Sequence, residues 1–134
     1  MKGRFKLMLL GIFGGAALAG TPSPARVQLD NFLAAFNTGD RATITVFGKD
    51  HAPPDFLRPA IVDQTLEMSR TSGGYDVLEV HETDPFSLTS RVRARATNEV
   101  VVLAIAVGSD EPERIRVITF QDAPAHPLVT TPDK

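Results

Sequence analysis

The spacing of apolar residues changes near residue 74, and this change constrains the fold more than any other feature. Before it, apolar residues recur every three or four positions, the period of an amphipathic helix. After it they alternate, the period of a half-buried strand. Gly73 and Gly74 stand at the change, as expected where a helix stops. Helices followed by a run of strands predict an α+β domain, with the helices packed on one face of a curved, four-stranded antiparallel sheet.

Two helices are indicated clearly in the first half of the chain. Residues 25–37 carry an apolar stripe, preceded by Ser23 as an N-cap and Pro24 at the first helical position. Residues 59–71 carry a second stripe with charged residues on the opposite side.

The segment between them is ambiguous. "TITV" is β-branched and locally favours a strand. The spacing of Ile44 and Phe47, together with Asp40 as a capping carboxylate, favours a short helix over residues 40–47. Glycine and proline then predict that "GKDHAPPD", residues 48–55, is a loop.

The second half predicts four strands joined by short links. They are expected at residues 75–83, 87–97, 99–107 and 114–121. Short links favour antiparallel neighbours in a meander. The third strand, "VVVLAIAV", is apolar on both faces, so we expect it to lie in the middle of the sheet.

The N-terminus has the layout of a secretory signal: a cationic start, an apolar run, and an A-x-A triplet that ends at Ala19. The run is shorter than the roughly 20 residues that a membrane span needs, although a retained anchor stays an alternative. We therefore expect a protein exported to the periplasm or secreted. The predicted organisation is a signal peptide at 1–19, an extended lead at 20–25, the α+β domain at 26–122 and a Pro-rich flexible tail at 123–134.

Composition excludes several functions. The chain has no cysteine, which excludes thiol catalysis, disulfides and thiolate metal sites. With 14 basic and 16 acidic residues, loss of the three basic residues of the signal leaves a net charge of about −5. Such a chain repels nucleic acid and anionic membrane, so we expect neither as a partner.

Three stretches carry a family resemblance: "LAAFNTGD" at 33–40, "TSGGYDVLEV" at 71–80 and "ERIRVITF" at 113–120. With the order of elements, they resemble the nuclear-transport-factor-two-like, or SnoaL-like, cystatin-type domains. More narrowly, the chain is similar to accessory domains of secreted bacterial serine hydrolases and peptidases. The resemblance implies a conical half-barrel that can leave a pocket at its open end. Some relatives are isomerases or cyclases, others bind small molecules, and many only dimerise or dock.

No catalytic residue, cofactor or metal site is predicted. Steroid-isomerase relatives use a carboxylate base with a tyrosine in an apolar pocket, but the single tyrosine here, Tyr75, lies at a helix-to-strand junction. We interpret Tyr75 as a rim residue with its ring in the core and its hydroxyl in solvent, and we count it among the candidate binding residues. The interior is expected to be filled by Phe32, Phe36, Leu66 and Val102.

Two polar groups are candidate binding residues. Asp50, His51 and Asp55 share the predicted loop and could bind a metal or move a proton, or simply be solvated. Arg91, Arg93 and Arg95 share one strand face and could grip an anionic ligand or an acidic partner. The alternative for the arginines is a cross-strand charge ladder with Glu79 and other carboxylates.

These observations leave two hypotheses. The first is a non-catalytic exported module that dimerises, or binds an envelope protein, through the outer face of the sheet. The second is a small-ligand binder or isomerase-like enzyme that uses a pocket inside the cone.

Overall fold

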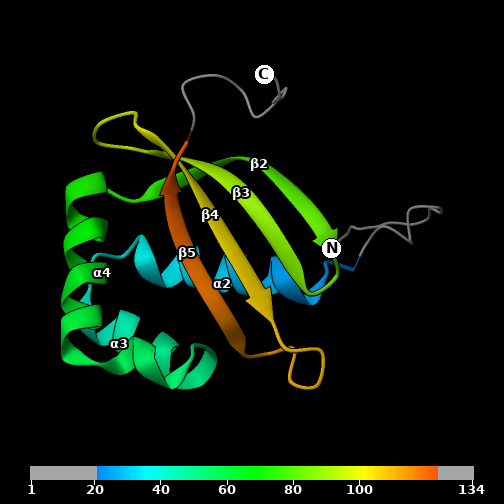
Figure 1. Ribbon diagram of the computed structural model, residues 1–134. Coiled ribbons are helices and arrows are strands. Elements are labelled where there is room, and N and C mark those ends of the chain that lie inside the picture. The colour runs from blue at the N-terminus through cyan, green and yellow to red at the C-terminus, as the bar shows by residue number, and fades with distance from the viewer. Residues whose placement is uncertain (1–20, 124–134) are drawn as a thin grey trace, which may run out of the picture.

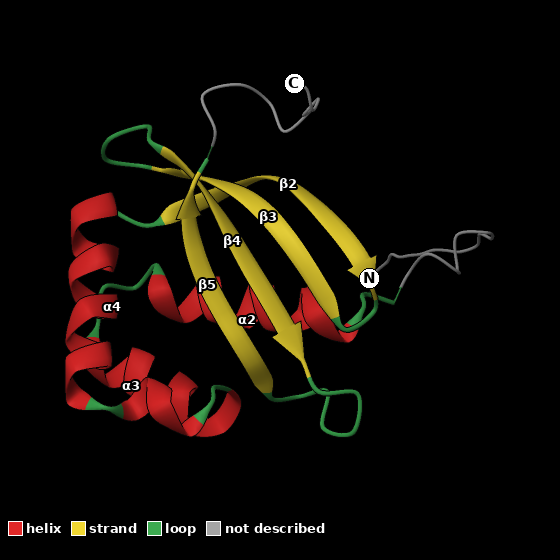
Figure 2. Ribbon diagram, in the orientation of Figure 1, coloured by secondary structure: helices red, strands yellow, loops and turns green. Residues whose placement is uncertain are grey.

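The computed structural model describes residues 21–123, in which helices precede a four-stranded sheet (Figures 1 and 2). The elements are α2 (Pro24–Phe36), α3 (Arg41–His51), the 3-10 helix η1 (Pro54–Leu57), α4 (Pro59–Ser72), β2 (Tyr75–Asp84), β3 (Ser87–Ala94), β4 (Val100–Val107) and β5 (Ile115–Asp122). The predicted α+β class is confirmed. The predicted signal peptide and nearly all of the predicted tail lie outside the described residues.

The first helix, α2, begins as its sequence indicates. The Ser23 hydroxyl accepts a hydrogen bond from the Arg26 amide at 3.1 Å, and Pro24 follows at the first helical position. Its apolar stripe, with Leu29 and Phe32 almost fully buried, faces the sheet. In Figure 1, α2 crosses one face of the sheet, while α3 and α4 stand to one side, beyond β5.

Asp40 caps α3. Its Oδ2 accepts hydrogen bonds from the Thr43 amide at 2.9 Å and from the Thr43 hydroxyl at 2.6 Å. These two bonds lower the pKa of Asp40, the direction opposite to that of a base working near neutral pH. The capping energy and the tertiary contacts of Ile44 outweigh the local strand preference, and the predicted helix is confirmed.

The prediction that regular structure stops at Gly48 is wrong, because α3 continues to His51. Gly48 is buried against η1. A Cβ at this position would lie 2.8 Å from Cδ1 of Phe56 and 2.9 Å from Cδ2 of Leu57. The glycine therefore permits a close approach of η1 to the helix and does not end it.

The sheet is an open meander in the order β2-β3-β4-β5, with antiparallel pairing throughout. As predicted, the third of the four strands, β4, has a neighbour on each side. Its residues alternate between the two faces. Those facing the helices are buried: Val101, Leu103, Ile105 and Val107. Those on the opposite, outer face are half-buried: Val100, Val102, Ala104 and Ala106.

The core between helices and sheet is rich in aromatic rings. Phe36 stacks on Tyr75 with ring centroids 5.3 Å apart, and Phe32 lies 5.4 Å from Phe36. Phe32, Phe36 and Leu66 fill the interior as expected. Val102 does not, because strand alternation places it on the outer face.

Among residues 21–123, no helix is both long enough and apolar enough to cross a membrane.

Candidate functional site

A hollow lined by residues of α4, β2 and β5, named here the main hollow, lies at one end of the sheet, between α4, the start of β2 and the end of β5. Its volume is about 330 Å³, at the small end of the range for small-molecule sites. The residues that line it are Glu67, Met68, Thr71, Ser72, Tyr75, Ala94, Thr97, Glu99, Val101, Phe120, Gln121 and Asp122. A larger but more open hollow, of about 650 Å³, lies beside the start of α2 and is lined by Thr21, Pro22, Ser23, Arg26, Asp30, Glu82 and Pro85.

Tyr75 is held at the wall of this hollow by the side chain of Asn37. The Asn37 carboxamide donates to the Tyr75 carbonyl at 3.0 Å and accepts from the Tyr75 amide at 2.9 Å. This pair of bonds imitates a neighbouring strand at the place where β2 begins. The end of α2 thereby fixes the position of the first residue of the sheet.

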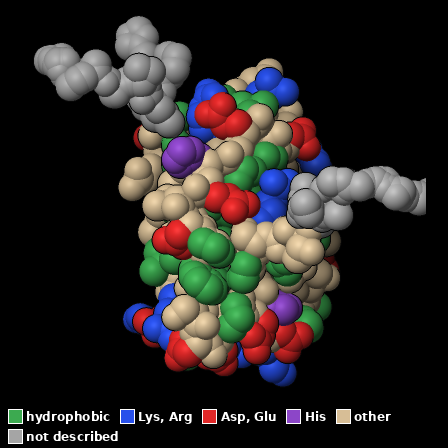
Figure 3. Space-filling view, turned by 90° about the vertical axis from the view of Figure 1, so that its right-hand side faces the viewer, with side chains coloured by type: hydrophobic (Ala, Val, Ile, Leu, Met, Phe, Trp, Pro, Cys, Tyr) green, Lys and Arg blue, Asp and Glu red, His purple; other side chains and the backbone are tan. Residues whose placement is uncertain are grey.

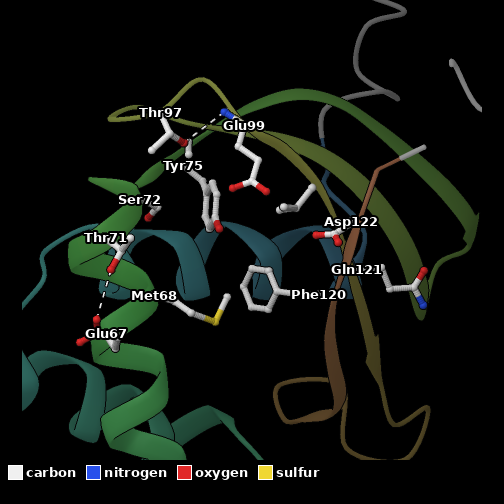
Figure 4. A pocket seen from close by; sticks show the side chains of 12 residues that line it. Glu67, Met68, Thr71, Ser72, Tyr75, Thr97, Glu99, Phe120, Gln121 and Asp122 are labelled. Atoms are coloured by element: carbon white, nitrogen blue, oxygen red, sulfur yellow. Dashed lines mark hydrogen bonds between the residues drawn. The ribbon is translucent and has the colours of Figure 1, made fainter. Parts of the chain in front are cut away.

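The Tyr75 side chain is only 7% exposed, yet its hydroxyl points into the hollow (Figure 4). Burial is the main cause that raises the pKa of Tyr75 above its usual 10.0, and the negative charge of Glu99 raises the pKa further. A hydrogen bond with Ser72 acts in the opposite direction. The phenol is therefore neutral at physiological pH, where it can donate or accept a hydrogen bond but cannot act as a base.

Three carboxylates reach the hollow from three different elements. Glu67 is on α4, Glu99 precedes β4, and Asp122 ends β5. Figure 4 shows the carboxylates of Glu99 and Asp122 pointing into the space beside Tyr75 from two different sides, while Glu67 is more distant and accepts a hydrogen bond from the Thr71 hydroxyl at 3.4 Å. None of these three carboxylates takes part in the ion pairs found among the described residues.

The floor of the hollow is apolar. Met68 and Phe120 form it in Figure 4. The Phe120 ring centroid lies 5.9 Å from that of Tyr75 and 6.0 Å from that of Phe36, so the floor is continuous with the aromatic core. The arrangement suits a ligand with an apolar part and a polar or charged part.

The described residues contain no group of three Asp, Glu or His side chains close enough together to hold a metal ion. The carboxylates around the hollow are therefore spread over its wall and do not converge on one point.

Of the predicted binding residues, only Tyr75 lies at this hollow. Asp50 and His51 are in the last turn of α3 and Asp55 is in η1, at the opposite end of the molecule. His51 Nδ1 lies 3.2 Å from the Glu113 carbonyl. Asp55 lines a second, shallower hollow beside β5, together with Pro53, Phe56, Ile61, Arg116, Val117 and Ile118.

The three arginines are on the outer side of the sheet, away from the main hollow. Arg91 pairs with Glu79 at 3.5 Å, and Arg95 pairs with Asp76 at 2.9 Å. Arg93 stands opposite Asp76 in the strand register, and Arg95 lies just beyond the end of β3. The contacts of Arg91 and Arg95 match the charge ladder that was the alternative to an anion site.

Glu67, Glu99 and Asp122 were missed by the sequence analysis. For Asp122 a signal existed: Ile118, Phe120 and Asp122 alternate on the inner face of β5, so an acidic residue follows two apolar ones toward the interior. Glu67 stands on the charged side of its helix, and Glu99 reads as a turn residue. Neither carries a signal in its local pattern.

Comparisons of the chain with protein-family models, with curated proteins and with solved structures found no match.

Proposed function

We propose that the protein is a non-catalytic exported module that pairs with a second copy of itself, or docks on another envelope protein, through the outer face of its sheet. The observation that carries this proposal is the apolar half of that face. Val102 and Ala104 at its centre are half-buried, Val117 beside them is 47% exposed, and no described element covers them. A face of this kind is typical of an interaction surface.

The arrangement of the face favours a symmetric pair. The strand register places Ala104 and Ala106 of β4 beside Thr119 and Val117 of β5, which makes a strip without charged or large side chains. The β2 and β3 half carries both signs of charge, as in the pair of Arg91 and Glu79. A two-fold axis through the strip would pack the apolar residues of one copy against those of the other and leave the charged residues of β2 and β3 at the rim of the interface. Figure 3 shows a different side of the molecule, the one that lies on the right in Figure 1, where hydrophobic side chains also gather into a patch bordered by charged ones.

The finer assignment to the nuclear-transport-factor-two-like group belongs to the same proposal. It is supported by three features: helices that precede the sheet, a meander of four strands, and a helix that crosses the inner face. Export is supported by the cationic, apolar and small-residue segments of residues 1–19. N-terminal sequencing of protein recovered from an exporting host should begin at Gly20.

Val102→Glu tests the pairing. Val102 stands opposite Arg91 in the register, so a glutamate there gains a cross-strand partner within the monomer but places a charge in the proposed interface. We expect the parent protein to sediment as a dimer and Val102→Glu to sediment as a monomer with a cooperative thermal transition. The matched control is Val46→Glu, because Val46 is 56% exposed on α3, away from the sheet. A monomeric parent protein that binds no envelope partner would contradict the proposal.

A second candidate function, binding of a small ligand in the main hollow, is favoured by one specific observation. A nearly buried phenol and two carboxylates face the same 330 Å³ space. This function is compatible with a dimer, because the hollow opens beside α4 and the outer sheet face points away from α2.

A further inference from the structure

We infer that the main hollow binds a small organic cation, an ammonium group carried on an apolar body. The inference deepens the second candidate function and rests on it, since it names the chemical class that the lining residues would recognise.

The charge of the lining residues favours a cation. The lining contains three carboxylates, those of Glu67, Glu99 and Asp122, and no lysine or arginine. Arg95, close in sequence to Glu99, is directed elsewhere, because it pairs with Asp76 at 2.9 Å. The hollow is therefore a region of negative potential that attracts a cation and repels an anion.

The wide spacing of these carboxylates favours a molecular cation over a metal ion. A metal ion needs several ligands about 2 to 2.6 Å from one point, and no three acidic or histidine side chains among the described residues meet that need. A cation of molecular size does not need convergent ligands. Such a cation can lie between Glu99 and Asp122 and contact one carboxylate on each side, in the space shown in Figure 4.

An aromatic and thioether surface lies beneath the charged groups. Phe120 and Tyr75 lie with centroids 5.9 Å apart and tilted by 34°, and Met68 completes the floor. The π faces of aromatic rings attract ammonium groups, and an apolar body can rest on Met68. The Tyr75 hydroxyl, on a side chain only 7% exposed, supplies one hydrogen-bonding group directed into the same space.

The experiment compares two probes with the same apolar body: the cation 2-phenylethylammonium and the neutral 2-phenylethanol. The reporter is the ε-methyl carbon of Met68, because the other methionines are Met1 and Met8 and lie in the predicted signal peptide. We expect the cation to shift the Met68 signal in a saturable manner, at least fivefold more tightly than the alcohol. Added salt should weaken the binding of the cation only.

Charge-removing variants locate the interaction. Glu99→Gln and Asp122→Asn should each weaken binding of the cation by about two- to fivefold and leave the alcohol unaffected. Both side chains are exposed, so these variants should fold. Glu113→Gln, an exposed carboxylate outside the hollow, is the matched control and should bind like the parent protein.

The outcomes separate the two proposals. If the cation and the alcohol shift Met68 with equal affinity, or if the two variants bind the cation like the control, the hollow binds ligands but the cation inference is wrong. If neither probe shifts Met68, the ligand-binding function fails together with the inference.

Discussion

At Tyr75 two influences act in the same direction on one side chain. Burial raises its pKa, and the nearby negative charge of Glu99 raises the pKa further. Tyr75 is the only tyrosine of the chain, so the ultraviolet absorbance of the phenolate reports on it alone. Glu99→Gln should therefore move the titration midpoint to lower pH, toward 10.0, while Glu113→Gln leaves it unchanged. Equal midpoints for all three proteins would show that Glu99 does not face Tyr75 in solution.

The raised pKa of Tyr75 makes the free energy of unfolding depend on pH in the alkaline range. A group whose pKa is higher in the folded state than in the unfolded state keeps its proton longer when folded. The contribution of Tyr75 is fully present below pH 10.0 and is lost as the pH rises through the folded-state pKa. Chemical denaturation at a series of alkaline pH values should show this loss in the parent protein. Tyr75→Phe removes the ionising group, so its stability should fall less steeply over that range.

Among the elements, α3 shows where sequence patterns succeed and where they fail. Its start was predictable because an N-cap aspartate acts through local hydrogen bonds, to Thr43 in this case. Its end was not predictable, because glycine disfavours a helix by propensity. Here Gly48 stays helical because it packs closely against Phe56, eight residues further along the chain. Strand positions were predictable from alternation, except that the second strand, predicted over 87–97, ends at Ala94 because the chain turns at residues 95–97.

The residues that line the main hollow were harder to predict from the sequence than the strands. Tyr75 could be picked out as the single tyrosine at the junction of helix and sheet. Glu67, Glu99 and Asp122 come from three elements, and only the pairing of β4 with β5 and the packing of α4 bring them to one space. The sequence around each of these residues does not indicate that the three side chains lie close together.

Gly48→Ala tests whether the absence of a side chain at Gly48 allows η1 to approach α3 closely. Helix propensity alone predicts that alanine stabilises a helix by about 1 kcal/mol relative to glycine. A Cβ that approaches Phe56 and Leu57 within 2.9 Å should overpack the contact with η1, at a cost of about 1 to 3 kcal/mol. We expect urea denaturation to show a net loss of stability. The double variant Gly48→Ala/Leu57→Ala, compared with Leu57→Ala, should recover part of it, whereas a more stable single variant would refute the packing role.

On the scale of the whole molecule, the helices are coupled unequally to the sheet. α2 packs on β3 and β4, whereas α3, η1 and α4 pack mainly on α2 and on one another. The main hollow and the shallower one both lie where α4 and η1 face β5, one near each end of that strand. These two hollows therefore lie at the boundary where the outer helices meet the edge strand, whereas a wider and more open one, of about 650 Å³, lies between the start of α2 and the turn from β2 to β3.

Arg114 is a connection across this boundary. Its guanidinium donates to the Ala52 carbonyl at 2.7 Å and to the Lys49 carbonyl at 3.3 Å, so a residue next to β5 caps the C-terminus of α3. Arg114→Met keeps the apolar stem and removes both bonds. Because the side chain is 34% exposed, we expect a loss of about 1 kcal/mol, below the usual range for charged donors.

The decisive measurement is which parts of the molecule lose stability in Arg114→Met. Since α3 and η1 contact the sheet weakly, Arg114→Met should let them open without the rest, and amide hydrogen exchange over residues 41–57 should accelerate while that of β3 and β4 stays unchanged. Arg26→Met is the matched control, because Arg26 makes an exposed ion pair with Asp30 within α2 and should alter neither region. Uniform acceleration across the sheet would instead mean that the outer helices and the strands unfold as one unit, and that the boundary at β5 is not a line of weakness.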